Sequence, residues 1–158
     1  MKEIVGDIWD YHKQGLWIVI TTNGTVKTNG EAVMGRGVAL QAKQKFRNIA
    51  DWVGWSLRAR GNHCAIYTIQ LRVDDRLVAS GVITFPVKHD WQGRADIQLI
   101  EQSCQELVKL VEQENPEKIY MVRPGCGNGG LDWKDVKPIL EKYLDDRFVV
   151  VERRGGRE

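Results

Sequence analysis

The chain has few of the residues that stabilise small secreted or metal-bound proteins. Its 158 residues include only three cysteines, Cys64, Cys104 and Cys126, and their spacing matches neither a disulfide framework nor a zinc site. It also lacks an apolar run of membrane-spanning length and a signal-peptide pattern at its start. We therefore expect a soluble, cytoplasmic protein with reduced thiols and no membrane contact.

The sequence also lacks a strong excess of either charge and the best-known nucleotide motifs. Lys and Arg number 23 against 21 Asp and Glu, a net charge of +2, so the overall field does not favour nucleic acid, although a local basic patch remains compatible with it. There is no P-loop ending in Gly-Lys-Ser/Thr and no well-spaced G-x-G-x-x-G before a helix. No His, Asp, Glu or Cys cluster has metal-ligand spacing, so we expect no metal and no other cofactor.

What the chain does contain is an alternation of apolar runs and helical patterns. With 42% hydrophobic residues, its length fits one domain with a buried core. The pattern predicts a three-layer α/β/α sandwich around a central sheet, in residues 1–152, followed by a frayed tail at 153–158. A hairpin turn predicted at residues 72–76 makes this sheet mixed. The predicted strands are 3–8, 16–22, 64–71, 77–85, 118–122 and 148–152; the predicted helices are 38–46, 49–60, 95–114 and 138–144, the last preceded by a short turn from Asp132 because Pro138 would break a longer helix.

Two glycine-rich turns follow apolar strands and lead into helical segments. The first spans residues 21–37 and the second residues 123–133. A turn of this kind at the carboxyl end of a strand directs backbone N–H groups at one point, which suits a phosphate. In an α/β sheet two such turns face one crevice, so diphosphate is the first ligand to consider.

These residues together resemble a family. Gly6-Asp7-Ile8, a strand ending in Asn, the turn at residues 34–39 (Met-Gly-Arg-Gly-Val-Ala) and the loop at residues 125–133 (Gly-Cys-Gly-Asn-Gly-Gly-Leu-Asp-Trp) are similar to a macro domain over nearly the whole chain. The segment 85–91 and the Gly-Cys-Gly loop resemble the branch of ADP-ribosyl glycohydrolases that includes DNA-directed antitoxins and terminal glutamate-linked ADP-ribose hydrolases.

The resemblance implies a catalytic role for Lys88. This lysine ends the apolar run at residues 82–87, and from the residues alone a solvated strand cap is the simpler interpretation. Related glycohydrolases, however, place their catalytic lysine at the matching position, where the amine attacks the anomeric carbon of the distal ribose. The glutamate-linked hydrolases pair that lysine with an aspartate where this chain has Gly129, so the loop is closer to the DNA-directed branch. Asp132, three residues later, is expected to cap the following turn.

The resemblance also implies a set of ligand-binding residues. Asp7 would accept the adenine amino group and the backbone N–H of Ile8 would bond the ring. An asparagine would bond the distal ribose: Asn23 lies at the strand end, whereas Asn29 has the better spacing to the following turn and is slightly favoured. The alternative interpretation of either residue is a turn former in an Asn-Gly pair. Trp91 and Trp133 flank the site and are candidates to stack on a base. The glycine turns would bind the diphosphate through Met34, Gly35, Gly37, Gly125, Cys126, Gly127, Asn128, Gly129 and Gly130.

The preferred hypothesis is a metal-free enzyme that hydrolyses an ADP-ribosyl bond, preferably on DNA. The alternatives are hydrolysis of ADP-ribosylated protein or of free ADP-ribose derivatives (1″-phosphate or O-acetyl), and a non-catalytic ADP-ribose reader that would not need Lys88. The implied partners are ADP-ribose or an ADP-ribosylated substrate, single-stranded DNA and a cognate ADP-ribosyltransferase toxin. A basic rim for DNA is offered by Lys27, Arg36, Lys43, Lys45 and Arg47.

Overall fold

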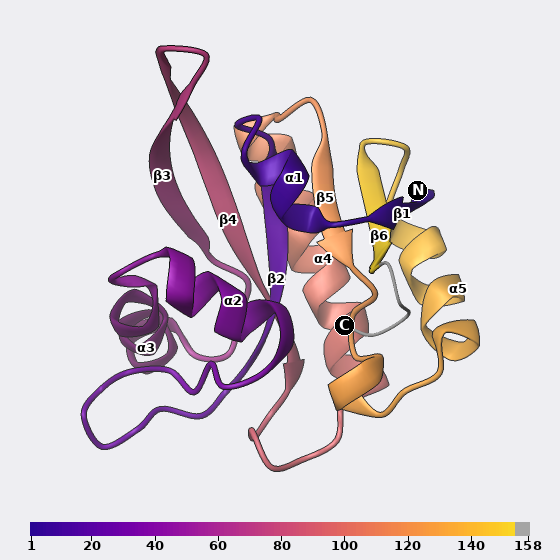
Figure 1. Cartoon of the computed structure of the whole chain (residues 1–158). Coiled ribbons are helices and arrows are strands. Elements are labelled where there is room, and N and C mark those ends of the chain that lie inside the picture. Colours follow the sequence, from indigo (N-terminus) through magenta and orange to yellow (C-terminus); the bar gives the residue numbers. More distant parts are fainter. Residues whose placement is uncertain (154–158) are drawn as a thin grey trace.

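The computed structural model describes residues 1–153 and shows, within them, one mixed sheet of six strands in the order β1-β6-β5-β2-β4-β3 (Figure 1). All neighbouring strands are parallel except β3 and β4, which are antiparallel. Asp74 and Asp75, both at positive φ, form the two-residue turn between them, so the predicted hairpin is confirmed. The strands are β1 (Lys2–Gly6), β2 (Trp17–Asn23), β3 (Ile66–Val73), β4 (Arg76–Lys88), β5 (Ile119–Val122) and β6 (Phe148–Arg153).

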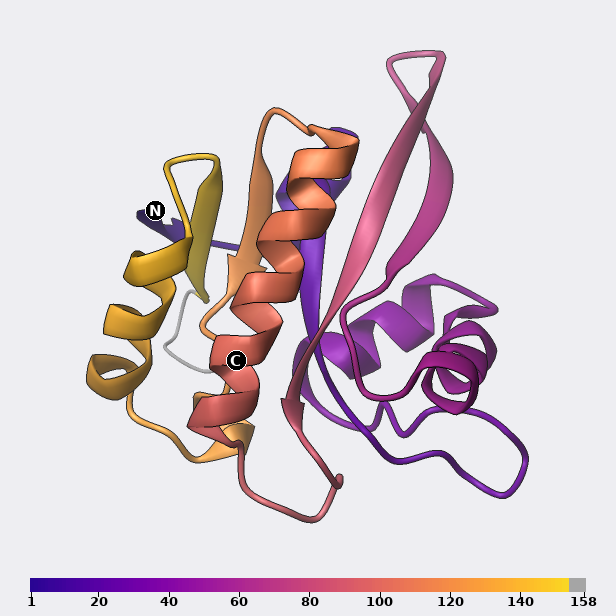
Figure 2. The same cartoon turned by 180° about the vertical axis from the view of Figure 1, so that it is seen from behind.

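Helices cover both faces of this sheet, as the predicted three-layer sandwich requires (Figures 1 and 2). One face carries α1 (Ile8–His12), α2 (Gly37–Lys45) and α3 (Ile49–Arg60), and the other carries α4 (Ile97–Glu114) and α5 (Trp133–Tyr143). Successive side chains of β2 point to opposite faces of the sheet and so enter two separate parts of the core. Ile18 and Ile20 pack under α1 to α3, whereas Val19 packs under α4 and α5. The short helix α1 has no counterpart among the predicted elements.

Helix α4 confirms the predicted segment 95–114 to within two residues. Asp96 caps its N-terminus by accepting a hydrogen bond from the N–H of Gln98 (2.9 Å), and Asn115 ends it in the left-handed conformation. Buried residues at helical spacing, including Ile100, Cys104 and Leu107, face the sheet. The helix therefore forms a rigid support behind the carboxyl ends of the strands.

Helix α5 corrects the sequence prediction, because it runs through Pro138 instead of starting there. Asp132 does occupy the N-cap position, but its carboxylate accepts no capping hydrogen bond. Val136 and Leu140 are fully buried and hold the segment helical on both sides of the proline. Pro138 and Lys134 are exposed, so water can satisfy the Lys134 carbonyl that loses its helical donor.

The structure describes only the first residue of the tail predicted at 153–158. Arg153 is the last residue of β6 and not part of a tail, and the rest of the predicted tail, 154–158, lies outside the described residues. Within residues 1–153, none of the helices combines the length and apolar character that a membrane crossing needs.

Candidate functional site

A cavity of about 450 Å³ opens where β2, β4 and β5 end. Strand ends contribute Asn23, Lys88 and Arg123 to its wall. The rest of the wall comes from Lys27, the loop at residues 33–36, the start of α2, Trp91 and the glycine loop after β5. The carboxyl ends of parallel strands meet at one edge of a sheet, which is why these distant segments converge. The two glycine turns predicted to share a crevice therefore do so.

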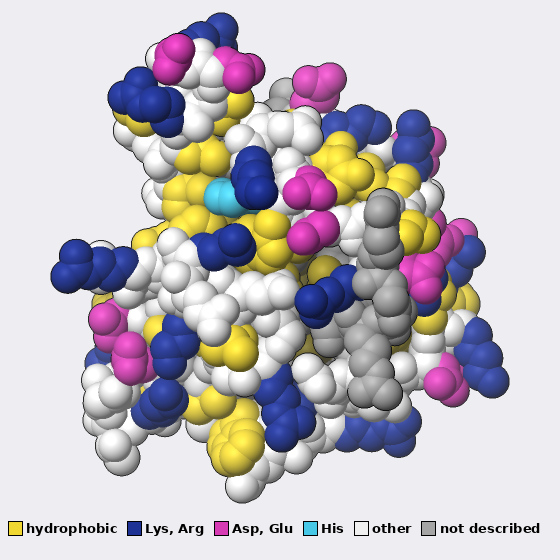
Figure 3. All heavy atoms as spheres, in the orientation of Figure 1, with side chains coloured by type: hydrophobic (Ala, Val, Ile, Leu, Met, Phe, Trp, Pro, Cys, Tyr) yellow, Lys and Arg dark blue, Asp and Glu magenta, His cyan; other side chains and the backbone are white. Residues whose placement is uncertain are grey.

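The wall of this cavity is positively charged. Lys27, Arg36, Lys88 and Arg123 line it, and no Asp, Glu or His does so among the described residues. On the face drawn in Figure 3, Lys and Arg side chains also gather around α2 and the loop below it. Such a cavity favours an anionic ligand and provides no carboxylate or imidazole for proton transfer.

Helix α2 points its N-terminus into the cavity, because Arg36, Gly37, Val38 and Ala39 all line it. The first N–H groups of a helix have no intrahelical acceptor, and here neither a side-chain cap nor an acidic residue in the first turn competes for them. Gly35 lies beside them, and a Cβ added to it would meet no atom within 4 Å. This part of the wall is open to a phosphate.

The glycine loop after β5 packs tightly against the start of α4. Its turn is closed by hydrogen bonds from the Leu131 N–H to the Gly125 carbonyl (3.0 Å) and from the Gly130 N–H to the Gly127 carbonyl (3.1 Å). A Cβ on Gly129 would lie 2.9 Å from the Cβ of Ala95, whose N–H donates to the Gly129 carbonyl. Gly129 is thus required by packing, and an acidic side chain at this position would displace Ala95.

Lys88 and Asn23 are neighbours across two parallel strands. Their Cα atoms are paired, and the register between β2 and β4 shifts between Thr22 and Asn23 so that β4 has one extra residue there. A bulge of this kind bends a strand end and redirects its side chains. Lys88 is half-buried, and both side chains line the cavity.

The structure favours Asn23 over Asn29 for the predicted asparagine, against the slight preference drawn from spacing. The Asn23 amide donates to the Val33 carbonyl (3.0 Å) and accepts from the Thr25 N–H (3.0 Å), so it is fixed in the cavity wall with one N–H and one lone pair in reserve. Asn29 is exposed, lies outside the cavity wall and bonds only Glu31 in an Asn-turn.

A second, small pocket continues the cavity toward β1. Val38 and Val122 line both, and Asp7, Ile8 and Gln41 line only the small pocket. Asp7 is the N-cap of α1, with one carboxylate oxygen accepting the Trp9 N–H (2.9 Å). The two pockets share Val38 and Val122 and so adjoin each other, and together they are called the groove below.

Comparison with known proteins identifies the fold family. A family model for the macro domain matches residues 26–140. The chain belongs to the macro domain family. This confirms the resemblance drawn from the sequence motifs.

Three bacterial proteins are similar to this macro domain over most of its length. A DNA ADP-ribosyl glycohydrolase of Mycobacterium bovis is 28% identical over 143 residues, in an alignment that covers 85% of this chain and 40% of that protein. The corresponding Thermus aquaticus protein is 30% identical over 127 residues, 77% of this chain and 33% of that protein. The solved macrodomain of Thermus aquaticus DarG has a TM-score of 0.74 and 25% identity, with 95% of each chain covered.

The third relative is a DNA ADP-ribosyl transferase-DNA ADP-ribosyl glycohydrolase fusion protein of Thermosipho africanus, 26% identical over 142 residues, 81% of this chain and 37% of that protein. A structure of Thermosipho africanus DarTG in complex with ADP-ribose has a TM-score of 0.78 and 20% identity, covering all of this chain and 43% of that one. This macro domain spans about one third to two fifths of the length of these curated relatives.

Most of the predicted site residues of this macro domain lie on the groove wall. Asn29, Gly127 and Gly130 do not, and Trp133 instead donates its indole N–H to Glu3 and stacks under Arg123. Sequence reasoning did not assign the cavity-wall residues at the strand ends, Thr21, Thr22, Val87, Val122 and Arg123, nor Val33, Val38 and Ala39. The signal that could have found the strand-end residues is their place at the carboxyl ends of parallel strands.

The thiols of this macro domain are poor candidates for nucleophiles. Cys64 and Cys104 are free thiols, as predicted. Burial, reinforced by nearby Glu101, raises the pKa of Cys104 to about 12, and burial also raises the pKa of Cys64 well above its usual value. Cys126 lines the cavity, with its thiol directed at the Pro124 carbonyl (3.7 Å). Lys88 is the stronger candidate.

Proposed function

We propose that this macro domain binds ADP-ribose in the groove and hydrolyses an ADP-ribosyl bond, preferably on DNA, with Lys88 as the nucleophile and without a metal ion. The observation that carries the proposal is the pairing of Lys88 with Asn23 at the strand ends, where both line a cationic cavity whose described wall holds no carboxylate or imidazole. The names of its relatives support the same activity.

We propose that ADP-ribose lies along the groove in one direction. The adenine would lie at Asp7 and Ile8, where the second Asp7 oxygen accepts its amino group. The diphosphate would lie between the start of α2, with Met34, Gly35 and Gly37, and the wall residues Gly125, Cys126, Asn128 and Gly129 of the glycine loop. The distal ribose would then reach Asn23 and Lys88.

The proposed hydrolysis uses the Lys88 amine, which would lie at the distal ribose. The Lys88 Nζ attacks the anomeric carbon, and the bond to the acceptor base breaks with its electron pair, after which the base takes up a proton. Opening of the ribose ring leaves an imine between Nζ and the anomeric carbon. Water hydrolyses the imine, which releases ADP-ribose and regenerates the amine.

DNA is the preferred acceptor because of what surrounds Lys88. Packing against Ala95 keeps an acid from position 129, where the glutamate-linked hydrolases that the sequence resembles carry an aspartate. Trp91 lines the cavity with 46% of its surface exposed, and its backbone N–H donates to the Thr25 hydroxyl (3.0 Å). Its indole is placed to stack on the modified base.

Of the basic residues predicted to form a rim for DNA, we propose that only those lining the cavity contact the DNA. Lys27 and Arg36 do so, whereas Lys43, Lys45 and Arg47 lie at or beyond the far end of α2, where Lys45 stacks on Trp9. We therefore assign contact with the flanking phosphates of single-stranded DNA to Lys27 and Arg36.

Turnover on ADP-ribosylated single-stranded DNA should fall with salt. Two phosphate contacts predict about a sevenfold loss of DNA affinity between 50 and 200 mM salt, and Lys27→Ala should reduce the log–log slope by about 0.7, whereas Lys43→Ala should leave it unchanged. Release of ADP-ribose from modified DNA and from modified glutamate, measured side by side across this range, checks the assignment. Release from glutamate alone, at every salt concentration, would show that protein is the acceptor.

Chelators should leave activity unchanged. Within residues 1–153, no group of three or more His, Cys, Asp or Glu side chains is arranged to hold a metal ion, and the proposed steps use only Lys88, substrate and water. The measurement is the initial rate with and without EDTA after dialysis. A rate that EDTA removes and a divalent cation restores would contradict the metal-free proposal.

A transferase is the proposed biological partner. The Thermosipho africanus relative is named as a fusion of a DNA ADP-ribosyl transferase with a DNA ADP-ribosyl glycohydrolase. An enzyme that removes ADP-ribose from DNA requires another that attaches it. We propose that this macro domain reverses the action of a cognate DNA-modifying ADP-ribosyltransferase toxin.

A further inference from the structure

The carboxyl end of β4, which carries Lys88, is held by three hydrogen bonds to consecutive carbonyls. The Ser103 hydroxyl of α4 donates to the Pro86 carbonyl (2.7 Å), and the Asp96 N–H donates to the Val87 carbonyl (2.9 Å). The third bond comes from a different part of the chain: the Asn62 side-chain amide donates to the Lys88 carbonyl (3.0 Å). β3 pairs with β4 only as far as Ile83, and the pairing of β4 with β2 is bulged near Lys88, so these bonds add to the ladder in fixing the backbone of Lys88.

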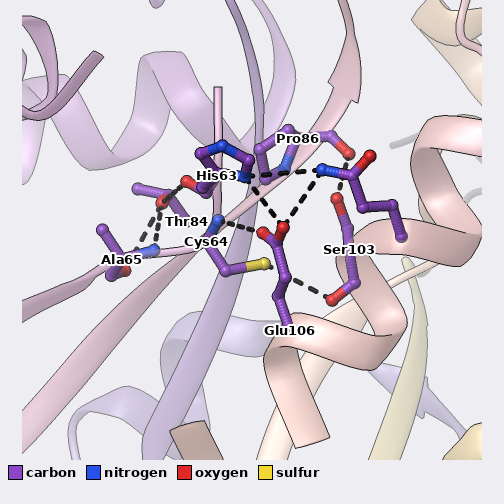
Figure 4. Close-up of polar contacts among 8 residues, drawn as sticks. His63, Cys64, Ala65, Thr84, Pro86, Ser103 and Glu106 are labelled. Atoms are coloured by element: carbon purple, nitrogen blue, oxygen red, sulfur yellow. Dashed lines mark hydrogen bonds and ion pairs between the residues drawn. The ribbon is translucent and has the colours of Figure 1, made fainter. Parts of the chain in front are cut away.

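The loop that carries Asn62 is itself firmly anchored (Figure 4). Glu106 of α4 bonds the His63 ring (2.8 Å) and accepts the Cys64 N–H (2.8 Å), and the Ala65 N–H donates to the Thr84 hydroxyl (2.9 Å). Burial pushes the pKa of Glu106 upward, but the hydrogen bonds from Cys64, Gln102 and His63 outweigh it and leave the pKa below its usual value. The anchor is therefore an ionised carboxylate at neutral pH.

Asn62 lies close behind the cavity without lining it. A Cβ on Gly24 would approach the Asn62 amide nitrogen to 3.0 Å and the His89 carbonyl to 2.6 Å. Gly24 directly follows Asn23, so the absence of a side chain there lets the Asn23 and Asn62 loops meet beside Lys88. Asn62 can thus affect the reaction only through the groups that it touches.

Burying the side-chain oxygen of Asn62 is energetically unfavourable. Its Oδ1 is buried and finds no hydrogen-bond partner among the described residues, a condition that native structures rarely keep without a reason. An apolar side chain of the same length would avoid that cost but would release the Lys88 carbonyl. The bond that Asn62 donates is the reason to retain a polar side chain here.

We propose that Asn62 is a positioning residue for Lys88, whose side-chain amide fixes the Lys88 carbonyl and so the direction in which the amine enters the cavity. This inference rests on the proposed function, because Lys88 must do chemistry for its direction to matter. It concerns the rate and not ligand affinity, since the proposed adenine and diphosphate contacts lie elsewhere in the groove.

The test compares Asn62→Leu and Asn62→Ala with wild type in single-turnover release of ADP-ribose. We expect the rate to fall roughly 10- to 100-fold, as for a misplaced catalytic group, with ADP-ribose affinity and thermal midpoint close to wild type. Gln105→Leu, which removes an exposed amide from α4, is the matched control and should keep the wild-type rate. In a Lys88→Ala background, Asn62→Leu should lower the residual rate no further, because both changes act on the same amine.

Two results would overturn the inference: a wild-type rate in either folded Asn62 variant, or an undiminished loss in the Lys88→Ala background. The test also separates this inference from the proposed function. An inactive wild type, or a fully active Lys88→Ala, contradicts the proposed function and the inference together. An active wild type, an inactive Lys88→Ala and fully active Asn62 variants contradict the role of Asn62 alone.

Discussion

Replacing Lys88 with alanine should abolish release of ADP-ribose from modified DNA while leaving ADP-ribose binding nearly intact. Lys88 is the one amine at the junction of β2 and β4 in the cavity wall, and the described wall offers no acid or histidine to take over its work. We expect the rate to fall by at least about 10²-fold. Single-turnover release and ADP-ribose titration, on the same preparation, measure the two effects.

Two further variants sharpen this prediction. Lys88→Arg keeps the positive charge but lacks the nucleophilic amine, so it should be nearly as slow as Lys88→Ala; a near-normal rate would mean that only charge is needed. Lys109→Ala removes an exposed lysine of α4 and should behave as wild type. Turnover by Lys88→Ala equal to that of wild type would exclude a catalytic role for Lys88 and favour another group.

Replacing Gly35 with valine should abolish binding of ADP-ribose without harming the fold. A Cβ at Gly35 meets no protein atom within 4 Å, and the residue lines the cavity beside the N-terminus of α2, where the diphosphate is proposed to bind. Wild type should gain about 2.7 kcal/mol of stability from ADP-ribose at 100 times its Kd, or a rise in Tm of roughly 5–10 °C. The variant should show no such rise while melting at the wild-type temperature without ligand.

Gly129→Val is the variant to compare with Gly35→Val. A Cβ at Gly129 would collide with Ala95 at 2.9 Å, so this variant should lower the Tm without ligand and is a poor probe of binding. A Gly35→Val protein that keeps the full ligand-induced rise in Tm would place the diphosphate elsewhere. A wild-type protein that shows no rise with ADP-ribose would contradict the ligand itself.

The sequence predicted the features that depend on local patterns. The periodicity of α4, its Asn115-Pro116 end and the hairpin at Asp74 and Asp75 each follow from a few neighbouring residues. The shared crevice of the two glycine turns could also be predicted, because parallel strands bring their carboxyl ends to one edge of the sheet.

The features that depend on contacts distant in sequence could not be predicted. Pro138 stays within α5 because Val136 and Leu140 are buried against the sheet, which no local rule shows. Asn23 replaces Asn29 on the cavity wall because its partners, Thr25 and Val33, close the loop around it. Asn62 lies 26 residues before Lys88, and only the fold brings its amide to the Lys88 carbonyl.

The central claim, that the Lys88 amine attacks the anomeric carbon of the distal ribose, is tested most directly by trapping the imine. The measurement is peptide mass spectrometry after a single turnover on ADP-ribosylated single-stranded DNA in the presence of cyanoborohydride. The account predicts ADP-ribose reductively attached to the peptide that contains Lys88, and no such peptide from Lys88→Ala. Normal release of ADP-ribose by wild type with Lys88 unmodified would contradict it.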